Sequence, residues 1–117
     1  MSTETADAKY DEQWELVMAG LDRAVRWVKE HKDVLLRGGF HLHLNRDTGI
    51  EIHFGYLSLY DTEREAALRE LFRGRVAQKR ISNDEVQYVL RDAGLTFEWS
   101  IWRSRVEAKP ETIEVTL

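Results

Sequence analysis

Three of the four histidines in this 117-residue chain fall in two short segments, and their spacing suits metal coordination. His41 and His43 lie in FHLHLN, and His53 lies with Glu51 in IEIHFGY. If the two segments pair as a hairpin, His41 is opposite His53 and His43 is opposite Glu51, about 5 Å apart at Cβ. Imidazole and carboxylate are ligands of zinc and other divalent first-row metals. The spacing predicts a candidate metal site of His41, His43, Glu51 and His53; the plainer interpretation is a solvated polar strand face.

No residue is assigned a catalytic role. The chain has no cysteine, no G-x-S-x-G sequence and no glycine-rich phosphate loop. A dyad of His53 with Glu51 is not expected either, on the ground that adjacent strand residues point to opposite faces. We therefore expect a non-enzymatic protein with no cofactor, unless a divalent metal binds the histidines.

A basic segment near the end of an expected middle helix is a second candidate site. Its members are Arg73, Arg75, Lys79 and Arg80. The elements from Thr62 onward can be drawn as a winged helix whose reading helix, 83–93, enters the DNA major groove. That helix would begin with the carboxylates Asp84 and Glu85, and residues 61–94 carry seven acids and seven bases. Nucleic-acid binding is therefore an alternative interpretation, beside arginines that only cap a helix end.

A tryptophan with neighbouring arginines is the third candidate. Trp102 falls on the polar side of an alternating segment, next to Arg103 and Arg105. Partly exposed tryptophan beside arginine is typical of protein interfaces. We predict partner contacts at Trp102, Arg103 and Arg105; the alternative is that a further element covers this face and buries Trp102.

The elements that position these residues follow from hydrophobic periodicity. Apolar residues recur at three- and four-residue steps between Trp14 and Val28, which predicts an amphipathic helix from Asp11 to a point within 31–37. Residues 1–9 are mostly polar and are expected to form a flexible tail ahead of a single domain over 10–117.

The histidine segments, 40–45 and 50–56, alternate apolar and polar residues and predict a β-hairpin. Gly49 supplies the left-handed position that the turn requires. The register sets Leu44 opposite Ile50, Leu42 opposite Ile52 and Phe40 opposite Phe54. All apolar side chains then share one face, and the imidazoles share the other.

Helical patterns return after residue 60 and are followed by two strands. Capping boxes at Thr62–Glu65 and Ser82–Glu85 predict two helices, and alternation predicts strands from Leu95 and over 111–117. The order is α-β-β-α-α-β-β, an α+β domain with a mainly antiparallel sheet packed against a long N-terminal helix and two shorter helices. Trp14, Phe97 and Trp99 are expected in its core.

Composition narrows the function classes. The chain is 43% hydrophobic and 32% charged, with a net charge of −4 and no apolar run long enough to cross a membrane. No strong field points to nucleic acid or a membrane surface, and the absence of cysteine favours the cytoplasm. We expect a protein-binding module of the adaptor, immunity or inhibitor type. Self-association through an open sheet edge at Glu111–Leu117 is a version of the same hypothesis.

Overall fold

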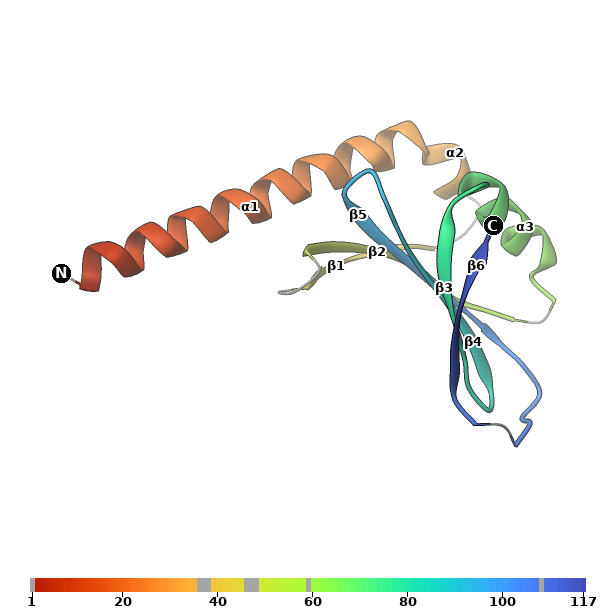
Figure 1. The fold of residues 1–117 in the computed structure, drawn as a ribbon. Coiled ribbons are helices and arrows are strands. Elements are labelled where there is room, and N and C mark those ends of the chain that lie inside the picture. The colour runs from red at the N-terminus through yellow and green to blue at the C-terminus, as the bar shows by residue number, and fades with distance from the viewer. Residues whose placement is uncertain (1, 36–38, 46–48, 59, 108) are drawn as a thin grey trace.

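The computed structural model describes residues 2–35, 39–45, 49–58, 60–107 and 109–117 and has the expected α+β class. Figure 1 shows a long helix that leads into a twisted sheet. The elements are α1 (Ser2–Glu30), α2 (Lys32–Leu35), β1 (His41–Asn45), β2 (Gly49–Leu57), α3 (Thr62–Leu71), β3 (Val76–Ile81), β4 (Glu85–Asp92), β5 (Leu95–Trp102) and β6 (Glu111–Thr116). Residues 2–9, expected as a flexible tail, lie in the first turns of α1.

The six strands form one sheet in the order β1-β2-β5-β4-β3-β6. Only β2 and β5 run parallel, and every other described pair is antiparallel. The final strand, β6, is an edge of the sheet, as the sequence predicts. The helices lie on one side of this sheet (Figure 1), so its two faces differ in what covers them.

The core lies between the helices and one sheet face, and aromatic rings fill it. Trp27 of α1 contacts Phe97 of β5 with 4.7 Å between ring centroids, and Phe72 at the end of α3 contacts the same Phe97 at 4.8 Å. Phe97 and Trp99 are buried as expected, at 0% and 1% exposure. Trp14, also expected in the core, is 65% exposed, because α1 extends beyond the sheet that covers its later turns.

The hairpin has the predicted register. His41 pairs with His53, His43 with Glu51 and Leu44 with Ile50. Gly49 has φ +82°, the left-handed conformation that the turn requires. On the apolar face, Ile50 is buried, whereas Leu44 on the edge strand β1 stays 63% exposed.

The helix predicted over 83–93 is wrong, because this segment forms the strand β4. It pairs with β3 and β5, and its side chains bury at every second residue, at Tyr88 and Leu90. Ala93 and Gly94 both have positive φ, at 51° and 74°, so they form a tight hairpin turn instead of a helix C-cap. The winged-helix arrangement is therefore not formed.

The helix α3 begins as expected, but its cap differs. Asp61 is the N-cap residue, and no side-chain hydrogen bond caps the helix, so Thr62 does not form a capping box with Glu65. Asp61 instead accepts a hydrogen bond at Oδ2 from the backbone N–H of Ser58. Its carboxylate thus closes the turn between β2 and α3.

Candidate functional sites

The sheet face that no described helix covers carries the histidines in two cross-strand rows. Because residues paired across strands share a face, one row runs from His41 through His53 to Glu98. The neighbouring row runs from His43 through Glu51 to Thr96. Both rows lie opposite to the apolar face that packs against α1, so the sheet separates the histidines from the core.

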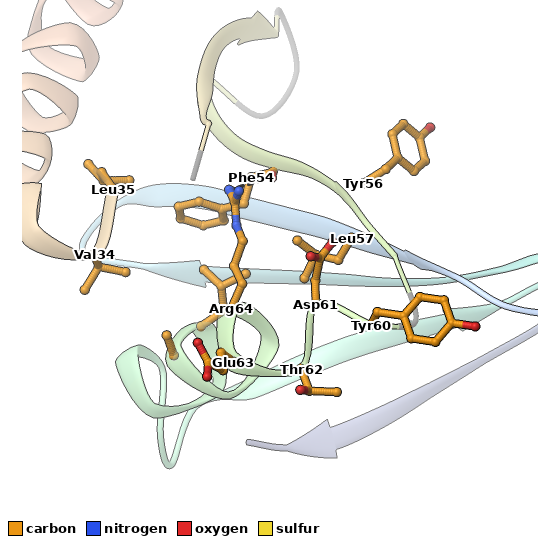
Figure 2. Close-up of a pocket in the computed structure, with 12 residues that line it drawn as sticks. Val34, Leu35, Phe54, Tyr56, Leu57, Tyr60, Asp61, Thr62, Glu63 and Arg64 are labelled. Carbon is orange, nitrogen blue, oxygen red and sulfur yellow. Dashed lines mark hydrogen bonds between the residues drawn. The ribbon is translucent and has the colours of Figure 1, made fainter. Parts of the chain in front are cut away.

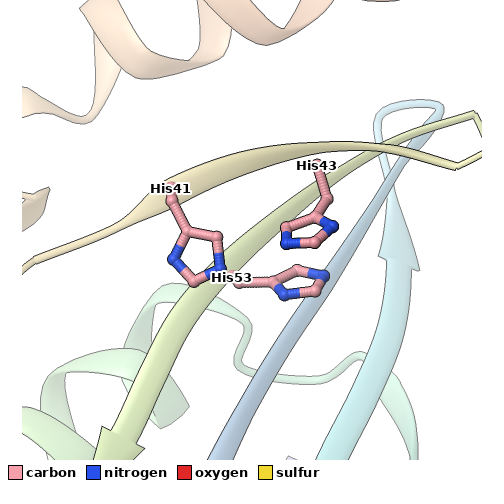
Figure 3. Close-up of side chains that lie close together, drawn as sticks. All are labelled: His41, His43 and His53. Atoms are coloured by element: carbon pink, nitrogen blue, oxygen red, sulfur yellow. The ribbon is translucent and has the colours of Figure 1, made fainter.

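The three imidazoles form a tight cluster (Figure 3). The ring centroids of His43 and His53 are 4.4 Å apart, and their planes differ by 7°. The ring of His41 lies 5.1 Å from that of His43 and 5.0 Å from that of His53. One nitrogen from each ring lies within 4.8 Å of the other two, so three of the four predicted ligands meet, whereas Glu51 groups with His53 and Glu98 instead.

His53 is held between two carboxylates. Its Nε2 lies 2.8 Å from Oε1 of Glu51, and its Nδ1 lies 3.3 Å from Oε1 of Glu98. The sequence interpretation that His53 and Glu51 point to opposite faces is therefore wrong. Residues two apart on a strand share a face, and the rule for adjacent residues does not apply to this pair.

Glu98 is a member of the cluster that the sequence reasoning missed. It comes from β5, beside His53 in the parallel ladder, and its side chain is 24% exposed. Alternation with Phe97 and Trp99 places Glu98 on the polar face of its strand. Nothing in the sequence signals that β5 lies next to β2, because 37 residues and three elements separate the two strands.

Three polar residues of this sheet face are buried, although no described helix covers the face. Glu51 is 8% exposed, Thr96 beside it is 4% exposed, and Ser100 is 6% exposed. The Thr96 hydroxyl is buried and has no hydrogen-bond partner in the part of the chain that the structure describes. A buried polar atom of this kind is an available contact for water or a ligand group.

The four basic residues of the nucleic-acid alternative do not form one surface. Arg73 pairs with Glu70 at 3.5 Å, and Arg75 pairs with Asp92 at 3.3 Å. The Lys79 ammonium lies over the Tyr88 ring on the helix side of the sheet, whereas Arg80 donates to Gln87 on the other side. Each cation thus has a partner within the chain, and none lies on a helix that could enter a groove.

The three predicted partner contacts differ in how exposed they are. Trp102 is 45% exposed and stacks on Tyr56, which is 63% exposed, with ring centroids 4.8 Å apart. Arg105 is exposed. Arg103 is partly buried: its Nη2 donates to the carbonyl of Ser82 at 2.6 Å, so this arginine holds the β3–β4 turn.

A pocket of about 440 Å³ lies on the helix side, where α2, the end of β2 and α3 meet. Figure 2 shows Arg64 reaching from α3 toward Phe54. Its guanidinium donates to the carbonyls of Phe54, at 3.0 Å, and of Gly39. The pocket is thus spanned by an arginine that ties the start of the hairpin to α3, and its lining contains no histidine.

Comparison with protein-family models, with curated proteins and with solved structures finds no match. Within the described residues, no helix is both long and apolar enough to cross a membrane.

Proposed function

We propose that this protein is a non-enzymatic interaction module that binds a second copy of itself through α1. The observation that supports this proposal is an apolar seam on α1 that the sheet leaves uncovered. Trp14, Met18 and Val25 are 65%, 43% and 46% exposed, although they lie on a helix whose later turns reach the core. The cytoplasmic setting expected from the sequence is part of the proposal.

The seam has the spacing of a coiled coil. Its members, Trp14, Met18, Leu21, Val25 and Val28, follow one another at steps of four, three, four and three residues. This repeat places apolar side chains where a second helix can interdigitate with them. At 1.5 Å per residue the seam is about 21 Å long. Two of its members, Leu21 and Val28, also pack partly against the core, so the seam borders the side of α1 that faces the sheet. That side uses Gly20, Ala24 and Trp27.

The shape of the molecule agrees with an unpartnered helix. The radius of gyration is 17.1 Å, whereas a compact domain of this length has about 13 Å. The first turns of α1 extend past the sheet (Figure 1). An isolated amphipathic helix gains little stability in water, so a partner that covers the seam stabilises this segment.

Charge along α1 selects the second copy and its direction. The early turns carry the acids Asp11, Glu12 and Glu15. The late turns, 21–30, carry three bases and two acids, a net charge of +1; the bases are Arg23, Arg26 and Lys29. Two antiparallel helices bring the acidic end of each against the basic end of the other, whereas parallel helices set like charges together. With Leu21 at the centre, Trp14 meets Val28 of the partner subunit, and Glu15 lies beside the partner's Lys29.

The test measures mass by light scattering over a dilution series from about 1 mM. The wild-type chain is expected to change from dimer to monomer on dilution. Met18→Lys should abolish the dimer, because it places a charge in the seam. Glu15→Lys and Lys29→Glu should each weaken dimerisation, and the double variant should restore it.

Gln13→Ala is the matched control, since Gln13 is an exposed, uncharged residue of the same helix outside the seam. It should leave the dissociation constant within about twofold. A monomer at every concentration, or a double charge variant no tighter than the singles, contradicts the proposal.

The exposed Tyr56–Trp102 stack favours a second contact surface, for a different protein. Aromatic residues are enriched at interfaces because they bury a large apolar area with few rotatable bonds. Trp102, Arg103 and Arg105 remain the predicted contacts, with Arg103 holding the adjoining turn. Trp102→Ala should then remove a partner retained by the wild-type chain from its native cell extract, while Met18→Lys should still retain it.

A further inference from the structure

We propose that His41, His43 and His53 form a binding site for one divalent transition metal ion of the zinc type. The site lies on the uncovered sheet face, away from the α1 seam, and does not depend on the self-association proposed above. Figure 3 shows the three rings facing one another from β1 and β2. The hairpin register that pairs His41 with His53 brings them together, so the site is built by the fold and not by one flexible segment.

The spacing of the nitrogens is close to that of a bound site. One nitrogen from each imidazole lies within 4.8 Å of the others. Three imidazoles on one tetrahedral zinc, with Zn–N distances of about 2.0–2.1 Å, have nitrogens about 3.3 Å apart. His41 and His43 are exposed on an edge strand, so their rings can close this gap by side-chain rotation without a change in the sheet.

His53 is the ordered ligand around which the other two close. It is partly buried, and carboxylates contact both of its ring nitrogens. A metal at Nδ1 replaces the 3.3 Å contact of Glu98, and Glu51 keeps its 2.8 Å hydrogen bond to Nε2. A carboxylate behind a ligating histidine fixes the ring orientation and makes the imidazole a stronger donor. Glu51 is thus the positioning residue, although the sequence pattern predicts it as a ligand.

Charge and burial favour a cation at this position. Glu51 and Glu98 both lie beside His53, and Glu51 is only 8% exposed. A divalent ion offsets two carboxylates that are partly withdrawn from water. The unpartnered Thr96 hydroxyl, next to Glu51 in the sheet, is a further oxygen for a metal-bound water. The nitrogen-rich ligand set favours zinc over magnesium, which prefers oxygen.

The test is calorimetric titration of the tag-free, full-length chain with zinc chloride. We expect one zinc ion per chain. His43→Ala should weaken binding at least tenfold by removing a ligand, and Glu51→Gln should weaken it about 10- to 100-fold by removing the positioning carboxylate. Cobalt(II) is the spectroscopic probe: visible absorption typical of tetrahedral coordination should form in the wild type and be lost in His43→Ala.

Gln78→Ala is the matched control, because Gln78 lies on the same sheet face through the pairs with Val89 and Glu98. It should bind zinc like the wild type. Circular dichroism confirms that each variant is folded. No saturable binding below about 100 μM zinc overturns the proposal, since that corresponds to only about 5.5 kcal/mol. Wild-type affinity in folded His43→Ala also overturns it, and so does binding that depends on Glu98 but not on His41 or His43.

Discussion

The indole of Trp27 lies against the ring of Phe97, with 4.7 Å between the centroids and 49° between the planes. This contact joins the longest helix to β5 near the middle of the sheet, and both residues are at most 6% exposed. The part of α1 after Gly20 therefore contributes to the core, whereas the part before Gly20 does not. The two tryptophans of α1 therefore have different roles.

Trp27→Ala should destabilise the fold by about 3–5 kcal/mol, because it leaves a cavity among Phe54, Phe72 and Phe97. Trp14→Ala is the same substitution on the same helix at a 65% exposed position, and it should change the free energy of unfolding by less than about 0.5 kcal/mol. Urea denaturation at concentrations where the chain is monomeric measures both. Equal losses for the two variants contradict this division of α1.

The register of the β1–β2 hairpin was predictable, because only one register places all its apolar side chains on the same face. A shift by one residue moves Ile50 and Ile52 to the solvent face and brings imidazoles into the core. The cluster of His41, His43 and His53 follows from that register alone. Glu98 does not, because the parallel pairing of β2 with β5 depends on how the whole chain folds.

The segment 83–93 shows why one pattern is ambiguous. Val86, Val89, Leu90 and Ala93 fit the three- and four-residue steps of a helix, and Ser82 with Glu85 imitates a capping box. The same segment also fits a strand with Val86, Tyr88 and Leu90 on one face, and the structure has this arrangement. In the structure, β3 and β5 lie on either side of this segment, and their backbone groups hydrogen-bond to its own. The order of apolar residues within 83–93 carries no information about these neighbouring strands.

A β-bulge at Gly55 determines the position of Tyr56, which stacks on Trp102. The pairing of β2 with β5 shifts between His53 and Tyr56, and Gly55 has φ +81°. Gly55→Ala should cost about 1–2 kcal/mol, because an L-residue is strained in this conformation. Gly39→Ala should be nearly neutral, since Gly39 has no positive φ and its added methyl meets no atom within 4 Å. Thermal denaturation compares the two, and a neutral Gly55→Ala refutes the role of the bulge.

Arg103 should contribute to stability more than Arg105 does. Arg103→Ala removes the donor to the Ser82 carbonyl and should lower the free energy of unfolding by about 1.5–3 kcal/mol. Arg105→Ala, the same change at an exposed position two residues later, should have an effect below about 0.5 kcal/mol. Urea denaturation of both variants decides the matter, and a larger loss for Arg105→Ala contradicts the assignment of Arg103 to the β3–β4 turn.

If the histidine cluster binds zinc, the ion should also stabilise the fold, because it joins the edge strand β1 to β2. At a free zinc concentration of 100 times Kd, the gain is about 2.7 kcal/mol, provided that the unfolded chain does not bind. For a chain of this length that corresponds to a rise in Tm of about 10 °C.

Differential scanning calorimetry with zinc measures this shift. Magnesium at the same concentration is the control, and it should leave Tm unchanged because imidazole is a poor ligand for it. His43→Ala, which removes a ligand from an exposed edge position, should keep the metal-free Tm within a few degrees and lose most of the rise. An equal rise in this variant would place the stabilising zinc elsewhere on the chain and exclude the three-histidine site as its origin.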